Sequence, residues 1–154
     1  MVDGHPVSST RIREALTEGN ISIAASLLGH RYTIVGIVIR GDGRGRVLGF
    51  PTINIVVDRE KLLPKDGVYT VWVGLPEGTL PGVMNLGIRP TVDGKQRSLE
   101  CHLLDFDGDL YGREVEVSLV ERLRDEQKFQ NLQDLIAQIE KDVSIARRVF
   151  QAQC

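Results

Sequence analysis

The sequence has few aromatic residues, few cysteines and no long apolar segment. Aromatic side chains make up 5% of its 154 residues, whereas barrels that bind single-stranded nucleic acid display stacked aromatics. Neither Cys101 nor Cys154 has a CxxC partner or a histidine at metal-ligand spacing, which argues against a zinc site and favours a reducing, cytoplasmic setting. No apolar run approaches the roughly 20 residues that span a bilayer. Because the net charge is only −2, any anion site must be local.

The first thirty residues differ from those that follow. SSTRIREALTEGN and ISIAASLLGH predict two short helices, ended by Gly19 and Gly29. Helices of this length cannot form a core of their own, so we expect them to dock on the rest of the chain.

The central part of the chain has the pattern of β-strands separated by turns rich in Gly, Pro and Asp. Six short strands without intervening helices exclude parallel βαβ units and favour an antiparallel barrel or sandwich. A final helix is predicted after Asn131, a suitable N-cap, with one apolar face. The strands are expected at residues 31–40, 53–58, 67–74, 81–87, 97–105 and 113–120, and the helix face at Leu132, Leu135, Ile136, Ile139, Val143 and Ala146. The predicted fold is mainly β: a six-stranded antiparallel, Greek-key-like closed barrel with a C-terminal helix and two short N-terminal helices.

A glycine-rich stretch, RGDGRGRVLGFPTINI, runs from Arg40 to Ile55. A P-loop or a Rossmann fingerprint would lead into a helix, but here Gly49 is followed by Phe-Pro-Thr and a strand. Glycines let consecutive N–H groups turn toward an anion, and arginines add donors for phosphate oxygens. The pattern fits a phosphate-binding loop, and a solvated hairpin loop is the alternative.

Thr52 and Asn54 alternate with apolar residues, so both lie on one face of the next strand. Their hydroxyl and amide oxygens are ligands that Mg²⁺ accepts when substrate phosphates and water complete its shell. The alternative is that both side chains line a solvated strand face.

In SLECHLLDFDGD, the side chains of Glu100 and His102 share one strand face. Glu100 is either an exposed carboxylate or a proton acceptor, and His102 is a rival acceptor at neutral pH. The acids of DFDGDLYG do not match the calcium-loop spacing, so this segment is predicted to be a turn.

These motifs together resemble the riboflavin kinases. GRVLGFPTINI is similar to the family signature, with Ile53 where alanine is usual. KLLPKDGVYTVWV, GVMNLGIRPT, SLECHLLDFDGDLYG and LRDEQKFQNLQDLIAQIEKD resemble further blocks of the family in the same order, from about Tyr32 to Arg147. The resemblance implies transfer of the ATP γ-phosphate to the ribityl 5′-hydroxyl of riboflavin, with Mg²⁺, to give FMN and ADP.

The resemblance also implies roles for individual residues. Glu100 corresponds to the catalytic glutamate, Thr52 and Asn54 to the metal-binding residues, and one of Arg122, Arg124 and Phe129 is expected to contact the flavin. A solvated strand-to-helix connection is the alternative for these last three. The nucleotide is expected to contact Gly41, Gly43, Arg44, Gly45, Arg46, Gly49, Phe50, Pro51, Thr52 and Asn54.

Ser8-Ser9-Thr10 resembles a motif near the end of the FAD synthetase (adenylyltransferase) domain that usually precedes bacterial riboflavin kinases. We therefore expect residues 1–30 to be a remnant of that domain and residues 31–154 to form the kinase barrel. The histidine-bearing nucleotide motif of the adenylyltransferase is absent, so no FAD synthesis is expected. The isolated module is expected to be a monomer without nucleic-acid or membrane partners. A non-catalytic flavin- or RNA-binding barrel is the alternative function.

Overall fold

The structure is a computed structural model that describes residues 9–39, 52–58, 61–91, 94–104, 106, 110–127 and 129–153. Its strands form one closed barrel in the order β1-β2-β5-β4-β3-β6, and every neighbouring pair is antiparallel. The predicted fold class is thus confirmed. The elements are α1 (Ser9–Thr17), α2 (Ile21–Leu28), β1 (Thr33–Ile39), β2 (Thr52–Val57), β3 (Gly67–Leu75), β4 (Gly78–Thr91), β5 (Gly94–Leu103), β6 (Glu114–Arg124) and α4 (Leu132–Gln153).

Alternating burial along the strands builds the barrel core. On β1, Ile34 and Val38 are buried, whereas Val35, Ile37 and Ile39 are exposed. Successive strand residues point to opposite faces, so one set fills the interior and the other forms the outer surface. The interior cluster includes Ile55, Tyr69, Val71, Val73, Met84, Leu86, Leu99, Cys101, Leu103, Val115, Val117 and Leu119.

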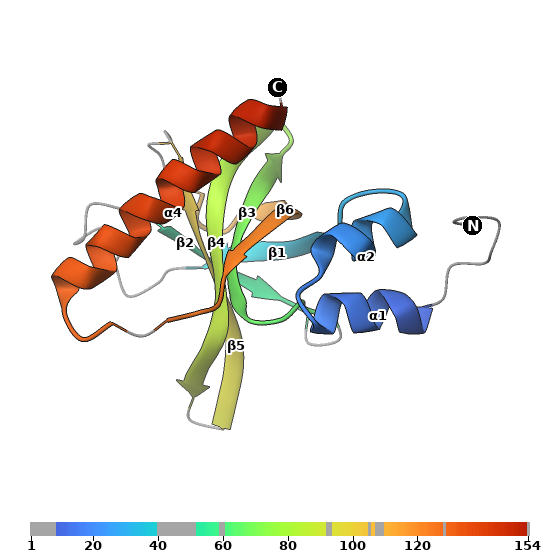
Figure 1. Ribbon diagram of the computed structural model, residues 1–154, viewed down its shortest axis with the longest axis horizontal. Helices are drawn as coiled ribbons and strands as arrows, with labels where there is room; N and C mark the ends of the chain where they lie inside the picture. Colours follow the sequence, from blue (N-terminus) through green and yellow to red (C-terminus); the bar gives the residue numbers. More distant parts are fainter. Residues whose placement is uncertain are drawn as a thin grey trace.

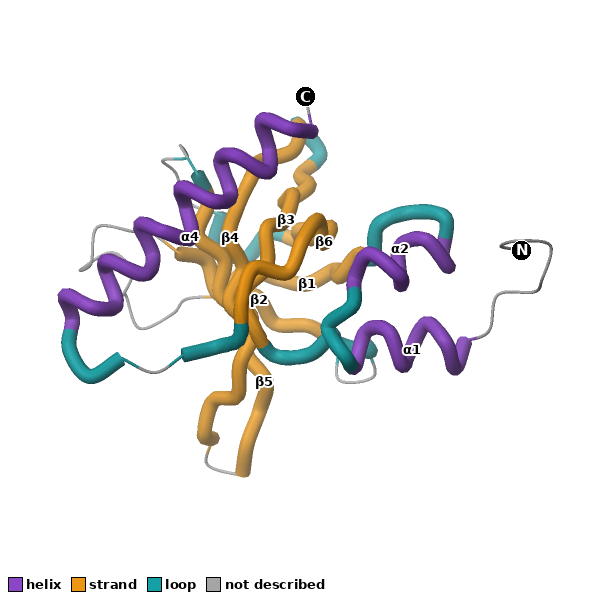
Figure 2. The backbone as a smooth tube through the Cα atoms, in the orientation of Figure 1, coloured by secondary structure: helices purple, strands orange, loops and turns teal. Residues whose placement is uncertain are grey.

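The two N-terminal helices dock on the barrel, as expected. Ile21 of α2 joins the interior cluster, and Leu16 packs with Ala24 in a smaller cluster that also contacts Tyr32. α2 ends at Gly29, which has φ +82° and donates its N–H to Ala25 O, as the sequence predicted. Figures 1 and 2 show this helical pair on the opposite side of the barrel from α4.

Helix α4 covers part of the outer face of the barrel. Asn131 caps it, because the Asp134 N–H donates to Asn131 Oδ1 over 2.9 Å. Phe150 packs on Trp72 with ring centroids 4.7 Å apart, in a cluster that includes Ala146. Leu132, predicted on the packed face, is 51% exposed, because the cluster takes its helix residues from Val143 onward. None of the described helices is both long and apolar enough to cross a membrane.

Strands β4 and β5 extend further than predicted and form the long hairpin seen in Figure 1. The strand predicted to begin at Pro81 begins at Gly78, so Pro81 lies inside β4, where it pairs with Trp72. The fixed φ of proline is compatible with a strand, so proline alone did not mark the end. β6 also continues past residue 120 to Arg124, through two irregularities in its pairing with β3.

Gly36 tests how tightly the barrel is closed. A Cβ at this position would lie 2.6 Å from Val56 O on the neighbouring strand, which is too close without a backbone shift. We expect Gly36→Ala to lower the free energy of unfolding by about 1–3 kcal/mol, measured by urea denaturation. Gly74→Ala is the matched control, because its nearest neighbour would lie at 3.4 Å. Equal stability of the two variants would contradict this account.

Candidate active site

Strand pairing places Glu100 between two asparagines on the outer face of the barrel. Glu100 of β5 is the Cα partner of Asn54 on β2 and of Asn85 on β4. Directly opposed residues of antiparallel strands point to the same face, with Cβ atoms about 4.5–5.5 Å apart. The predicted metal-binding Asn54 and the predicted base Glu100 are therefore neighbours, although 45 intervening residues separate them in the sequence.

On the same face, the next pair of opposed residues along β2 and β5 is Thr52 and His102. Thr52 pairs with His102, which pairs in turn with Val83 of β4. The Thr52 hydroxyl thus lies one row from the Asn54–Glu100 pair, on the strand that directly follows the glycine-rich stretch.

Asn54 is one of the few buried polar side chains in the described part of the chain. The described part of the chain buries three polar side chains, Asn54, Thr70 and Asp142. Thr70 donates to Glu121 O, and Asp142 accepts from Arg124. Asn54 is 9% exposed and its side chain lies beside Glu100. A polar side chain held at this position on the outer face is a candidate ligand-binding group.

The oxygen-rich composition of the site suits a hard cation. Thr52, Asn54 and Glu100 offer a hydroxyl, an amide oxygen and a carboxylate, which are ligand types that Mg²⁺ accepts. The described residues contain no group of three or more His, Cys, Asp or Glu side chains that could hold a metal by themselves. This donor set therefore fits a cation that arrives with phosphate oxygens.

An open, solvent-facing cavity of about 480 Å³ lies between the segment after β6 and the first turns of α4. The strand pairing that includes Glu100 continues toward α4, because Asn85 pairs with Val68 and Val68 pairs with Arg124. Arg124 binds Asp142 of α4 through Nε at 3.0 Å and Nη2 at 2.8 Å. Gln138, one helical turn before Asp142, donates to Asp142 Oδ1 and lines the cavity. The cavity lining comprises Gln127, Phe129, Asp134, Ala137, Gln138 and Lys141.

Of the three residues predicted to border the flavin, only Phe129 lines this cavity. The pairing of β3 with β6 shifts between Val68 and Tyr69, so Arg124 faces α4 and Arg122 lies beside the core residue Tyr69. Arg122 and Arg124 are separated by one residue, yet they bind protein groups on different faces of the barrel.

The remaining predicted nucleotide contacts fall outside the described residues. They are Gly41, Gly43, Arg44, Gly45, Arg46, Gly49, Phe50 and Pro51, and their assignment stays a prediction. The predicted acidic turn falls there too at Asp105, Asp107 and Asp109.

Residues 28–150 match the protein family described as riboflavin kinase, or flavokinase. This chain belongs to the riboflavin kinase family. The predicted family and the predicted enzyme class, a kinase, are confirmed by this match and by the relatives below.

Relatives of this riboflavin kinase domain are longer proteins. The bifunctional riboflavin kinase/FMN adenylyltransferase of Escherichia coli (strain K12) is 49% identical over 148 residues, which cover 96% of this chain and 47% of that protein. The chain thus spans about half the length of the curated relatives it matches.

Two solved structures share the fold. The crystal structure of a macrolide-efflux protein from Streptococcus pneumoniae has a TM-score of 0.87 and 37% identity, covering 92% of this chain and 46% of that one. Riboflavin kinase from Trypanosoma brucei has a TM-score of 0.58 and 27% identity, covering 77% and 76%.

Sequence reasoning missed Asn85, which lies beside Glu100, and Glu126, which lies over β4. Asn85 stands between Met84 and Leu86, so alternation already placed it on the outer face, but only the register shows that it opposes Glu100. A Cβ at Gly87 would collide with the carboxylate of Glu126, so Glu126 lies over β4 two residues from Asn85. No local pattern could reveal this contact.

Cys101, adjacent to Glu100 in sequence, points into the core and takes no part in the site. Burial raises the pKa of its thiol to about 12, so the thiol is neutral at pH 8. We expect iodoacetamide at pH 8 to leave Cys101 unmodified in the folded protein and to alkylate it in urea, as measured by peptide mass spectrometry. Equal labelling in both states would contradict the inward orientation.

Proposed function

We propose that this chain is an ATP-dependent riboflavin kinase that converts riboflavin and ATP into FMN and ADP. The observation that carries the proposal is the pairing of Asn54 with Glu100, which sets a carboxylate beside a buried amide on the outer face of the barrel. The family match supports the choice of substrates. The free, buried thiol of Cys101 and the use of ATP favour a cytoplasmic protein.

In the proposed reaction, Glu100 accepts the proton of the terminal ribityl hydroxyl as that oxygen attacks the γ-phosphorus. The new O–P bond forms while the bond from the γ-phosphorus to the β–γ bridging oxygen breaks, and ADP leaves with the electron pair. Phosphoryl transfer depends mostly on positioning and charge stabilisation, so the fixed register of β5 between β2 and β4 suits it.

Thr52 and Asn54 are proposed to bind the divalent cation, Mg²⁺, together with nucleotide phosphates. The cation would neutralise developing charge on the phosphoryl oxygens. The glycine-rich residues from Gly41 to Gly49 are proposed to hold the phosphates from the same side, because they directly precede β2.

The cavity beside α4 is the proposed site of the isoalloxazine ring. Phe129 offers an aromatic face there, and Gln127, Gln138 and Lys141 offer polar groups around it. The register row from Glu100 through Asn85 and Val68 ends at Arg124. Arg124 binds Asp142, which accepts a hydrogen bond from the cavity residue Gln138.

We propose that the chain makes FMN but not FAD. Residues 1–30 would be the end of an upstream adenylyltransferase domain and residues 31–154 the kinase barrel, because the curated relatives are bifunctional and about twice as long. The module is proposed to act as a monomer that binds neither nucleic acid nor membrane.

Glu100→Gln removes the proposed proton acceptor while preserving the side-chain shape. With riboflavin, ATP and Mg²⁺, we expect kcat for FMN formation to fall by about 10²- to 10⁴-fold with little change in either KM. Chromatography that separates FMN from FAD measures the rate and identifies the product. Glu116→Gln, an exposed glutamate on β6, is the matched control and should behave as wild type.

Three other outcomes would be informative. A higher KM with unchanged kcat in Glu100→Gln would reject Glu100 as the base. Equal FMN formation by wild type and Glu100→Gln would support kinase activity and would show that another residue acts as the base. No FMN from the folded wild type, with riboflavin still bound, would favour a non-catalytic flavin-binding module.

Thr52 can be tested by separating its hydroxyl from its shape. Thr52→Val is nearly isosteric but lacks the oxygen, and we expect it to raise the Mg²⁺ concentration for half-maximal activity by about tenfold. Thr52→Ser keeps the hydroxyl and should stay near wild type. The measurement is a Mg²⁺ titration of kinase activity at fixed ATP, and wild-type behaviour of Thr52→Val would refute metal binding by this side chain.

A further inference from the structure

The end of β6 carries two arginines that the strand irregularity turns to different faces. Arg122, with a side chain 19% exposed, donates from Nη2 to Asp66 O at 2.7 Å and to Asp125 Oδ1 at 2.6 Å. Its guanidinium lies 5.9 Å from the centre of the Tyr69 ring. Arg122 therefore joins the start of β3 to the residue that follows β6.

Arg124 also binds Asp125, the residue that follows β6. Its Nη1 donates to Asp125 O at 2.9 Å, while Nε and Nη2 bind the Asp142 carboxylate of α4. Arg122 thus binds the side chain of Asp125 and Arg124 binds its backbone. Asp125 is fixed between the barrel end and α4.

The N-terminal helices reach the same junction. A Cβ at Gly19 would lie 2.9 Å from Cδ and Nε of Arg122, so the turn between α1 and α2 packs against this side chain. Lys65 donates its backbone N–H to Leu16 O at 2.9 Å, and its ammonium lies 3.9 Å from Asp125 Oδ1. The Asp125 carboxylate therefore lies where three parts of the chain meet, and the Arg122 contact lowers its pKa.

The segment that leaves this junction forms one wall of the cavity. Glu126 lies over Gly87 of β4, and Gln127 and Phe129 line the cavity. We infer that Arg122, Arg124 and Asp125 form a clamp that positions this wall, and that the clamp sets the affinity for the acceptor substrate. The inference rests on the proposed function, in which the cavity receives riboflavin. In it the arginines are positioning residues, not groups that touch the flavin.

Asp125 offers a clean test, because its side chain is 74% exposed and its removal leaves the core intact. We would compare Asp125→Ala and Arg122→Lys with wild type in two measurements: hydrogen exchange of the peptide containing residues 125–131, and KM for riboflavin and for ATP. We expect faster exchange in this peptide and a riboflavin KM raised by about fivefold, with an unchanged ATP KM. A merely structural role would lower the amount of active enzyme without changing either KM.

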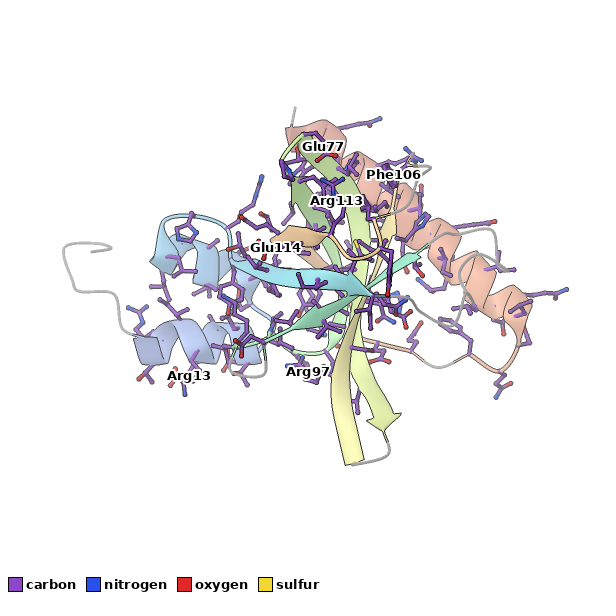
Figure 3. The ribbon with its side chains drawn as sticks, turned by 180° about the vertical axis from the view of Figure 1, so that it is seen from behind. Arg13, Glu77, Arg97, Phe106, Arg113 and Glu114 are labelled. Atoms are coloured by element: carbon purple, nitrogen blue, oxygen red, sulfur yellow. The ribbon has the colours of Figure 1, made fainter. Side chains whose placement is uncertain are left out.

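Glu77→Ala is the matched control. It removes the partner of Arg113, which is bound at 2.6 and 2.8 Å in an exposed pair beyond the other end of β3, visible in Figure 3. This variant should change neither the exchange of residues 125–131 nor the riboflavin KM.

Unchanged exchange in Asp125→Ala and Arg122→Lys would overturn the inference, and so would faster exchange with an unchanged riboflavin KM. If wild type makes no FMN, the proposed function fails, and quenching of riboflavin fluorescence decides the inference alone. Weaker riboflavin binding by both variants than by wild type would then support it. Equal binding, or no binding by wild type, would overturn it.

Discussion

Closure of the barrel is the constraint on which the site depends. Every strand pairs on both sides, so each register is fixed twice around the ring. A slip of one residue in β5 would turn Glu100 into the core and expose Leu99. The position of Glu100 between Asn54 and Asn85 is therefore maintained by all six pairings, including those far from the site.

The two faces of the barrel wall differ: the inner face packs the core, and the outer face carries the candidate site. Its interior is filled by apolar side chains, and the helical pair and α4 cover different parts of its outside. The outer strip of β2, β5 and β4 carries the polar residues Thr52, Asn54, Glu100 and Asn85. α4 and the segment after β6 line the cavity, and Glu126 of that segment lies over Gly87 of β4.

Much of the fold could be predicted from local patterns. Alternation identified the strands and the inward side of β5, and residue type identified the Asn131 cap. Helical periodicity indicated the face of α4 but not how far the barrel extends beneath it, so Leu132 was misplaced. Strand neighbours and register depend on contacts between distant residues. The sequence therefore did not predict that Asn85 opposes Glu100, or that Arg122 and Arg124 face different sides of the barrel wall. The role proposed for Glu100 came from resemblance, because a glutamate on the outer face of a strand has no distinguishing local pattern.

The alternation along β5 has a consequence for natural variation. Leu99, Cys101 and Leu103 are limited by the volume and polarity of a closed interior, whereas Glu100 and His102 face the side where ligands are proposed to bind. Adjacent positions of one strand are thus subject to unrelated selective pressures. A survey that averages substitution frequencies over neighbouring residues would combine positions limited by core packing with positions limited by ligand binding. Only a comparison made position by position would separate them.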